Sequence, residues 1–340
     1  MLRSARNFSL LLGIAIAVCV LPSLAQSVDL GWTHWDSSNQ VLFAEPKGDG
    51  RVFRAYPGSA SENIDIFRNF AGLQKVYVES VTSGPDGETL ISAILSMRDQ
   101  QPKALLLTYS DSGELVNKWE PARQSPDVIR YASDDDAVFV LGDSDLPDGA
   151  TNDSLLVEYS PDGRILKKLI PASTLKDGGQ SLSASSTNGQ VALRITKDRI
   201  YLYAPESREV LICDRSGQTL TTHSINAAVD RIASANGYHL VQTHHVDFTE
   251  DGDIVLELLL GTNSESQDYQ MAVVRVNAKT GQSTVVHRAS NGRLWFTGMK
   301  DDQYLYVESS QHLYIQANAG QEPIPFGDET VASAQTGRTN

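Results

Sequence analysis

The sequence predicts an all-β protein, most economically a β-propeller of six four-stranded blades, although five or seven blades also fit. The main observation is a repeated hairpin made of an apolar run, a turn that ends in Gly, and a second short strand. Clear copies are Ala104–Trp119, Leu155–Leu169, Val210–Ser224 and Ala272–His287, and weaker copies are Val52–Phe67 and Leu313–Phe326. A hairpin unit that returns every 20–50 residues or so is typical of solenoids and propellers.

The repeats divide residues 26–326 into six consecutive units, each of which ends in this hairpin. A four-stranded blade ordinarily takes about 40–50 residues, so six blades account for the whole segment as one domain. The unit lengths are uneven, which is why five or seven blades remain open. The expected units are Leu30–Phe70, Gln74–Pro121, Asp127–Pro171, Ser181–Ala227, Ala233–Arg288 and Asn291–Phe326.

The second unit shows the four strands of a blade most clearly. Its strands are expected at Lys75–Thr82, Glu88–Met97, Ala104–Ser110 and Glu114–Trp119. Val, Ile, Leu, Tyr and Thr dominate these segments, as half-buried pleated surfaces prefer. Gly113 and its counterparts in the other units supply the positive φ that hairpin turns require. Helical periodicity is weak, and Ser61–Gln74 fits a short helix as well as a strand.

The two ends of the chain are expected to lie outside the propeller. Arg3 and Arg6 precede the apolar stretch Phe8–Val20, and Ser23 and Ala25 stand where a signal peptidase requires small residues. Residues 1–25 therefore predict a signal peptide, and an uncleaved anchor is the alternative. Residues 327–340 are small and polar, which predicts a disordered tail. The protein is expected to be exported, either to a periplasm or to the medium.

Charge and cysteine content narrow the classes of partner. The formal net charge is −14, and an acidic surface repels phosphate backbones and anionic membranes, so we expect neither nucleic acid nor, after signal cleavage, a membrane. Cys213 is the only cysteine that follows the signal segment, so an internal disulfide is excluded in the mature chain. On a repeat strand it is expected to be a buried apolar residue rather than a nucleophile.

The repeated run, the Ser/Asp-x-Gly turn and the second strand resemble the blades of six-bladed propellers of the NHL and TolB-like kind. The resemblance extends over nearly the whole mature chain, but only at the level of the repeat. It implies a propeller fold in a group that includes protein-binding scaffolds, sugar-lactone hydrolases and lyases. It implies no catalytic residue, because no site motif of that group can be matched here.

Short motifs of other enzyme classes carry little weight. Ser173, Ser186 and Lys279 begin segments that match the S-x-x-K, S-x-N and K-T-G elements of penicillin-binding enzymes. The context excludes that reading, since the first element follows a Pro and precedes Gly178 and Gly179, and the last lies on the repeat turn. The sequence has no G-x-S-x-G elbow, no H-E-x-x-H motif and no phosphate-binding P-loop.

One acidic loop partly matches a calcium site. Calcium requires several hard oxygen ligands that converge from a tight loop. The candidate ligands are Asp143, Asp145 and Asp148, but the third Asp comes one residue late and no closing Glu follows. A solvated acidic loop is the alternative. No other cofactor is indicated.

Polar residues on the first strand of each unit are the candidates for a ligand site. In a propeller that strand lines the central channel, where charged side chains remain solvated, whereas a dry interface between blades penalises them. A one-residue slip of register would move them to the other face. His244 and His245 are expected on opposite faces, and His245 and Asp247 on the same one. The candidates are His34, Glu79, Arg130, Arg194, His245, Asp247 and Trp295.

These features favour an exported propeller that acts as a binding scaffold for a protein or a small-molecule ligand. The alternative is a propeller enzyme, a lyase or hydrolase that acts on a saccharide, lactone or peptide. A scaffold predicts a channel of mixed polar and aromatic side chains, whereas an enzyme predicts a metal or a His–carboxylate pair at the channel mouth. The sequence favours the binding scaffold over the enzyme and does not identify the ligand.

Export can be tested on the mature N-terminus. We expect exported material to begin at Gln26, because cleavage after Ala25 leaves Ser23 and Ala25 at the two positions that a signal peptidase reads. Intact-mass spectrometry of the protein recovered outside the cytoplasm measures this directly. Exported protein that retains residues 1–25 would contradict the predicted cleavage.

Overall fold

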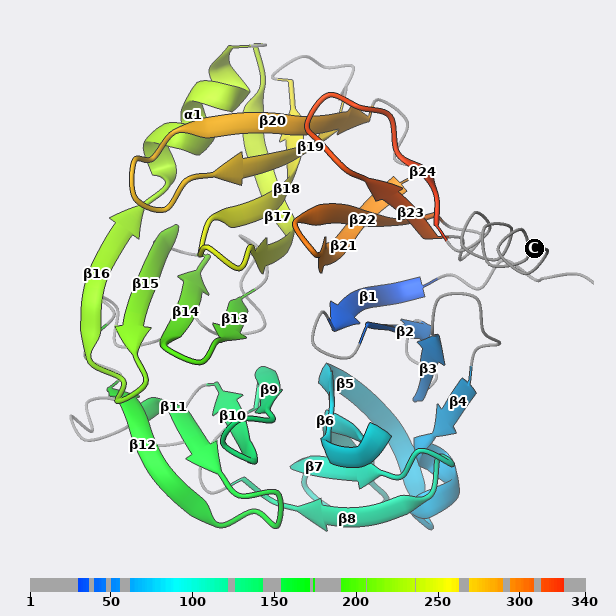
Figure 1. Cartoon of the computed structure of the whole chain (residues 1–340). Coiled ribbons are helices and arrows are strands. Elements are labelled where there is room, and N and C mark those ends of the chain that lie inside the picture. Colours follow the sequence, from blue (N-terminus) through cyan, green and yellow to red (C-terminus); the bar gives the residue numbers. More distant parts are fainter. Residues whose placement is uncertain are drawn as a thin grey trace, which may run out of the picture.

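The fold is a closed ring of six antiparallel sheets, each made of four consecutive strands (Figure 1). The computed structural model describes residues 30–36, 40–46, 50–55, 62–121, 126–142, 154–171, 174, 191–205, 207–235, 237–262, 269–289, 294–308 and 313–326. The predicted six-bladed propeller is confirmed, and five or seven blades are excluded. The signal segment and the tail lie outside the described residues. None of the helices in the described ranges combines the length and apolar character that a membrane crossing requires.

Each blade takes its strands in chain order from one unit of the sequence. Blades 1 and 2 contain β1 (Leu30–Asp36), β2 (Val41–Pro46), β3 (Arg51–Ala55) and β4 (Glu62–Asp65), then β5 (Leu73–Ser83), β6 (Thr89–Met97), β7 (Lys103–Tyr109) and β8 (Leu115–Trp119). Blades 3 and 4 contain β9 (Val128–Ala132), β10 (Ala137–Leu141), β11 (Ser154–Tyr159) and β12 (Ile165–Pro171), then β13 (Ala192–Ile195), β14 (Arg199–Ala204), β15 (Glu209–Asp214) and β16 (Thr219–Ser224). Blades 5 and 6 contain β17 (His239–Phe248), β18 (Ile254–Gly261), β19 (Tyr269–Val276) and β20 (Ser283–Ala289), then β21 (Leu294–Lys300), β22 (Gln303–Glu308), β23 (Leu313–Gln316) and β24 (Ile324–Pro325).

The few helices of the described residues lie between strands. The segment that fits a helix or a strand resolves into β4 followed by a 3₁₀ turn, Ile66–Asn69. A second 3₁₀ turn is Pro85–Gly87, and the one α-helix of the described part, α1 (Asn226–Ser234), joins β16 to β17. The helix buries Val229 and Ile232 in the core between blades 4 and 5. This helix was not predicted from the sequence, because only about two turns carry the apolar pattern.

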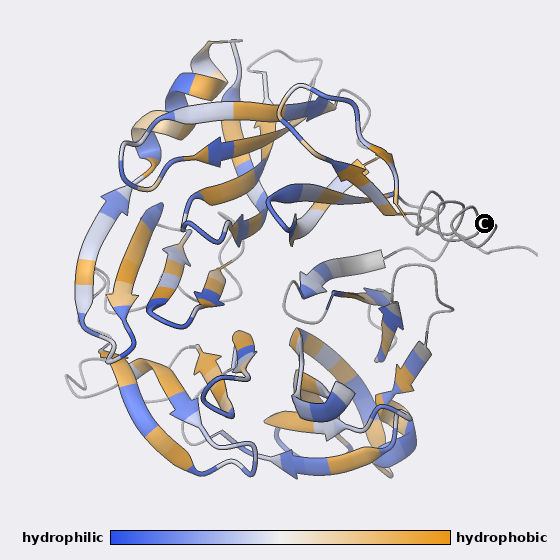
Figure 2. Ribbon diagram, in the orientation of Figure 1, coloured by the Kyte–Doolittle hydropathy of each residue, from blue (hydrophilic) through white to orange (hydrophobic). Residues whose placement is uncertain are grey.

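The core is distributed over the six interfaces between neighbouring blades. Strand β10 shows the principle, because Phe139 and Leu141 pack against blade 4 while Val138 and Val140 pack against blade 2. A strand buried on both faces needs an uninterrupted apolar run, which is what the sequence carries at this position. Hydrophobic positions accordingly follow the strands, and the turns are largely hydrophilic (Figure 2).

The ring closes by packing alone, because within the described residues no strand of blade 1 joins the sheet of blade 6. Trp35 and Leu42 of blade 1 meet Leu305 and Val307 of blade 6 in the closing core. Trp35 is only 1% exposed, so this aromatic residue near the start of the chain serves ring closure. Gly298 of β21 lies directly against Trp35, and a Cβ at this position would be 2.9 Å from the Trp35 Cβ.

Gly298→Ala should therefore destabilise the interface between blades 1 and 6, at which the ring closes. We expect a loss of about 2–4 kcal/mol in the free energy of unfolding, because the methyl group meets Trp35 and the backbone φ of +151° strains any other residue. The control is Gly281→Ala, which also has a positive φ but open space around it, and it should cost about 1 kcal/mol. Urea unfolding measures the loss of stability in both variants. Equal losses would show that Gly298 and Trp35 are not closely packed.

Candidate functional site

All seven candidate ligand-binding residues lie on the innermost strands of the blades, which are labelled in Figure 1. These strands are β1, β5, β9, β13, β17 and β21, and consecutive ones are neighbours around the ring. His34, Arg130, Arg194 and Asp247 line one cavity of about 400 Å³. The cavity lies where the innermost strands of blades 1 to 5 end, and its rim is formed by the turns after β9, β13 and β17.

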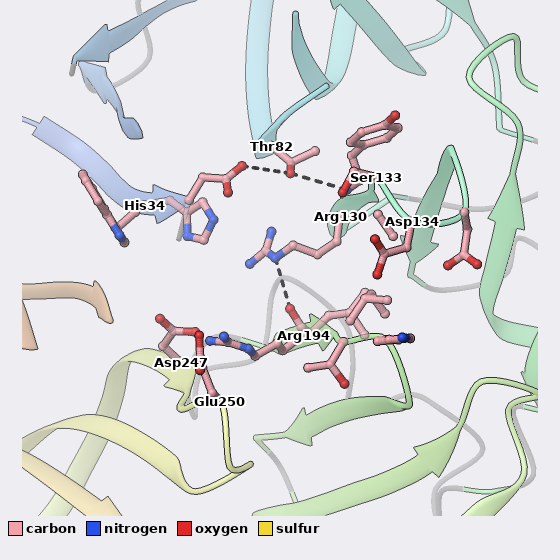
Figure 3. Close-up of a pocket in the computed structure, with 17 residues that line it drawn as sticks. His34, Thr82, Arg130, Ser133, Asp134, Arg194, Asp247 and Glu250 are labelled. Atoms are coloured by element: carbon pink, nitrogen blue, oxygen red, sulfur yellow. Dashed lines mark hydrogen bonds between the residues drawn. The ribbon is translucent and has the colours of Figure 1, made fainter. Parts of the chain in front are cut away.

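Arg130 of β9 is held by its backbone surroundings and points its guanidinium into the cavity (Figure 3). Its Nε donates to the carbonyl of Leu193 at 3.0 Å, and Nη1 donates to the carbonyl of Ile129 at 2.7 Å. Nη2 has no hydrogen-bond partner among the described residues. Burial lowers the pKa of Arg130, but an arginine stays charged at any physiological pH.

Arg194 of β13 lies beside it on the cavity wall, and its Nη1 donates to the carbonyl of Phe248 in blade 5. Neither Arg130 nor Arg194 forms a direct ion pair within the described part of the chain. Two guanidinium groups thus face one cavity without a carboxylate in direct contact. This is unusual, since a buried charge is costly unless it is paired.

Asp247 and Asp36 also line the cavity, but backbone N–H groups bind their carboxylates, and for each acid one of these donors belongs to the next blade. Asp247 Oδ2 accepts from the Met299 N–H at 2.9 Å, and its Oδ1 accepts from the Phe248 N–H at 2.7 Å. Burial raises the pKa of Asp247, while Arg194, these backbone donors and Arg130 pull it down. Asp36 Oδ2 accepts from the Ser83 N–H at 2.8 Å.

Two histidines lie close together, His34 on the cavity wall and His245 behind it, outside the lining. The rings of His34 and His245 are 6.5 Å apart. Burial and the charge of Arg130 hold the pKa of His34 well below its usual value and bring that of His245 to about 4. Both imidazoles are therefore neutral at pH 7. His245 does not pair with Asp247, whose oxygens are bound by the backbone instead.

The expectation that His244 and His245 lie on opposite faces is wrong. The register of β17 against β18 shifts between Thr243 and His245, which is the signature of a bulge. As a result both rings pack against β21, His244 at 5.8 Å from the Trp295 ring and His245 at 5.5 Å from the Phe296 ring.

The remaining candidates do not line this cavity. Glu79 is half-buried, and burial raises its pKa. Trp295 is 37% exposed and stacks on His244. Asp143, Asp145 and Asp148 lie outside the described residues, so the calcium site stays a prediction. Within the described residues, no three His, Cys, Asp or Glu side chains gather as they would around a metal ion.

Two residues of the site, Asp36 and Thr82, and one buried acid outside it, Glu257, were not among the candidates from the sequence. Thr82 donates to Asp36 at 3.3 Å and accepts from the Tyr131 N–H at 3.4 Å, so it joins blades 1, 2 and 3 (Figure 3). Glu257 of β18 is 2% exposed, and its Oε1 accepts from the Phe296 N–H at 2.8 Å. Glu257 could have been identified from the sequence, because it is the only charged residue in the apolar run Ile254–Leu260.

Comparisons with known proteins find only distant structural similarity. No family model matches the chain, and no curated protein matches it. Among solved structures it is similar to the C-terminal WD40 domain of Sif2 (11% identity, TM-score 0.42), covering 84% of this chain and 66% of that one. It is also similar to streptogramin B lyase (8% identity, TM-score 0.47, 88% and 83% covered) and to the periplasmic gluconolactonase of Pseudomonas aeruginosa (14% identity, TM-score 0.45, 86% and 84% covered). The site must therefore be interpreted from its own residues.

Glu257 gives the seam between blades 5 and 6 a pH dependence. Burial raises its pKa from an ordinary 4.5 to about 8, so the folded state holds a proton that the unfolded state has lost. The resulting stability is present below pH 4.5 and is lost as the pH rises through 8. Glu257→Gln keeps the acceptor for Phe296 and cannot ionise.

We expect Glu257→Gln to be more stable than the wild type by about 4–5 kcal/mol at pH 8.5, with the difference vanishing near pH 4.5. Urea unfolding at a series of pH values measures this difference. The matched control, Glu114→Gln, changes an exposed carboxylate and should show no such trend. A pH-independent difference for Glu257→Gln would contradict the assignment.

Proposed function

We propose that this protein is an exported propeller that binds a small anionic ligand in its channel cavity. The observation that carries the proposal is the pair of cavity-facing guanidinium groups, Arg130 and Arg194, neither of which has a direct ion pair in the described part of the chain. A planar guanidinium with free N–H groups matches a carboxylate or a phosphate in shape and charge.

The way the two arginines are fixed supports this proposal. Each is held by a backbone carbonyl of the next blade, Leu193 for Arg130 and Phe248 for Arg194. These carbonyls orient the guanidinium groups without neutralising them. A ligand would therefore meet a preorganised pair of donors and would not have to displace a bound carboxylate, which lowers the cost of binding.

The rest of the cavity is consistent with a small ligand. A volume of about 400 Å³ falls within the ordinary range of small-molecule sites. His34 is neutral near pH 7, so it can donate or accept a hydrogen bond without adding charge. Asp36 and Asp247 are bound to backbone N–H groups. Export rests on the signal segment of residues 1–25.

One observation favours the enzymatic alternative. His34 lines the same cavity as Arg130 and Arg194 and is unprotonated at neutral pH, as a general base must be. A lyase or hydrolase would then abstract a proton while the arginines stabilise the developing negative charge. A lactone or an acidic saccharide that is consumed in the presence of the protein, with loss of turnover in His34→Gln, would decide for this alternative.

Isothermal titration calorimetry with succinate, gluconate and inorganic phosphate tests the binding proposal, with mannitol as the neutral control. We expect at least one of the anions to bind and mannitol to show no heat of binding. Arg130→Gln should weaken anion binding about tenfold or more, because it removes a charge-assisted hydrogen bond. The matched control is Arg164→Gln in the same blade, whose exposed side chain pairs with Asp162.

A thermal melt of each variant shows whether it is folded, and Arg194→Gln provides a second variant if Arg130→Gln is not. Equal affinities of the wild type, Arg130→Gln and Arg194→Gln would refute the site, and so would the absence of any anion binding to the wild-type protein.

A further inference from the structure

Exposed carboxylates stand at the rim of the channel cavity, whose inner wall carries two arginines together with Asp36 and Asp247. Asp134, on the turn after β9, and Glu250, on the turn after β17, both line the cavity and are both exposed (Figure 3). Neither carboxylate forms an ion pair or a hydrogen bond among the described residues. Two unpaired acids therefore stand at the entrance to a cavity whose inner wall carries Arg130 and Arg194.

Other charged groups on the rim offset this negative charge only in part. Asp135 also lines the cavity, but it forms an ion pair with Arg215. Lys197 is the one rim lysine and extends from the turn after β13. A simple anion would meet an unfavourable acidic entrance before it reached the arginines. A ligand that carries a positive charge at its trailing end would be attracted at both positions.

Acidic residues are common on this chain, whose formal net charge is −14. A role for the two rim acids must therefore be tested against other acids of the same turns. Asp136 and Asp251 belong to the same two turns as Asp134 and Glu250 and are equally exposed, yet they do not line the cavity. They provide the comparison, because they carry the same charges on the same turns. Asp136 also accepts a hydrogen bond from the Tyr131 hydroxyl at 2.9 Å, which the side-chain oxygen of Asn can still accept.

We propose that the ligand is dipolar: an anionic group, such as a carboxylate, binds Arg130 and Arg194, and an ammonium group at the other end lies between Asp134 and Glu250. This inference rests on the proposed anion site and adds the class of ligand. It selects amino carboxylates whose two charges are separated along the molecule over simple carboxylates of the same length.

Matched pairs of ligands test the proposal. The probes are ω-amino carboxylates, from β-alanine to 6-aminohexanoate, each compared with the unsubstituted carboxylate of the same chain length. We expect the amino compound of at least one pair to bind roughly three- to tenfold more tightly, the gain of one or two exposed ion pairs. The chain length of the best pair then measures the distance between the two ends of the site.

The variants identify the source of the preference. In Asp134→Asn/Glu250→Gln the preference for the amino compound should disappear, while the unsubstituted carboxylate should bind at least as well as before. In the control, Asp136→Asn/Asp251→Asn, the same two charges are removed from the same turns and the preference should persist. Both sets of changes are on exposed residues, so both variants are expected to fold, and a thermal melt verifies it.

The outcomes separate this inference from the function on which it rests. If carboxylates bind and depend on Arg130, but the amino compounds gain nothing, the anion site stands and the dipolar ligand is refuted. A preference that survives in Asp134→Asn/Glu250→Gln, or is lost in the control as well, also refutes it. If none of the probes binds, the anion site falls together with the inference.

Discussion

Side chains of the innermost strands hold each blade to the next one around the channel. Asp36 binds the backbone of Ser83, Arg130 that of Leu193, and Asp247 that of Met299. Thr82 and Arg194 bridge the intervening junctions in the same direction. Because the sheets share no strands in the described residues, these bridges are what satisfies backbone groups at the channel edge. An unsatisfied buried group of this kind would cost about 1–3 kcal/mol.

This constraint explains why the channel is charged. An apolar residue at any of these positions would leave a backbone carbonyl or N–H of the next blade without a partner. A long side chain that reaches a neighbouring carbonyl with one nitrogen still has other nitrogens to present, as Arg130 does with Nη2. The closing junction is made differently, by Trp35 against Gly298. The same residues therefore build the ring and leave two cations in its cavity.

The sequence predicted the structural features that recur in every blade, but not the features that occur only once. The hairpin repeat predicted six blades, and the strand expected at Lys75–Thr82 is β5, Leu73–Ser83. Every candidate residue lies on an innermost strand, because a polar residue among apolar neighbours marks that strand in each unit. The bulge at His244 breaks the two-residue period locally. Asp36 and Thr82 were missed because their partners are in other blades, more than 40 residues away, where sequence patterns carry no information.

The degree of burial along the channel decides which side chains of the site are charged. The histidines lose their charge because burial and the nearby Arg130 both disfavour an imidazolium. The arginines keep theirs, since no desolvation available in a protein deprotonates a guanidinium. The carboxylates Asp134 and Glu250 are exposed at the rim, where water stabilises their charge. The cavity thus has exposed carboxylates at its mouth and two guanidinium groups at its inner wall, where Asp36 and Asp247 already accept hydrogen bonds from backbone N–H groups. A ligand of the proposed dipolar kind would therefore turn its anionic group toward the arginines and its cationic group toward the exposed acids.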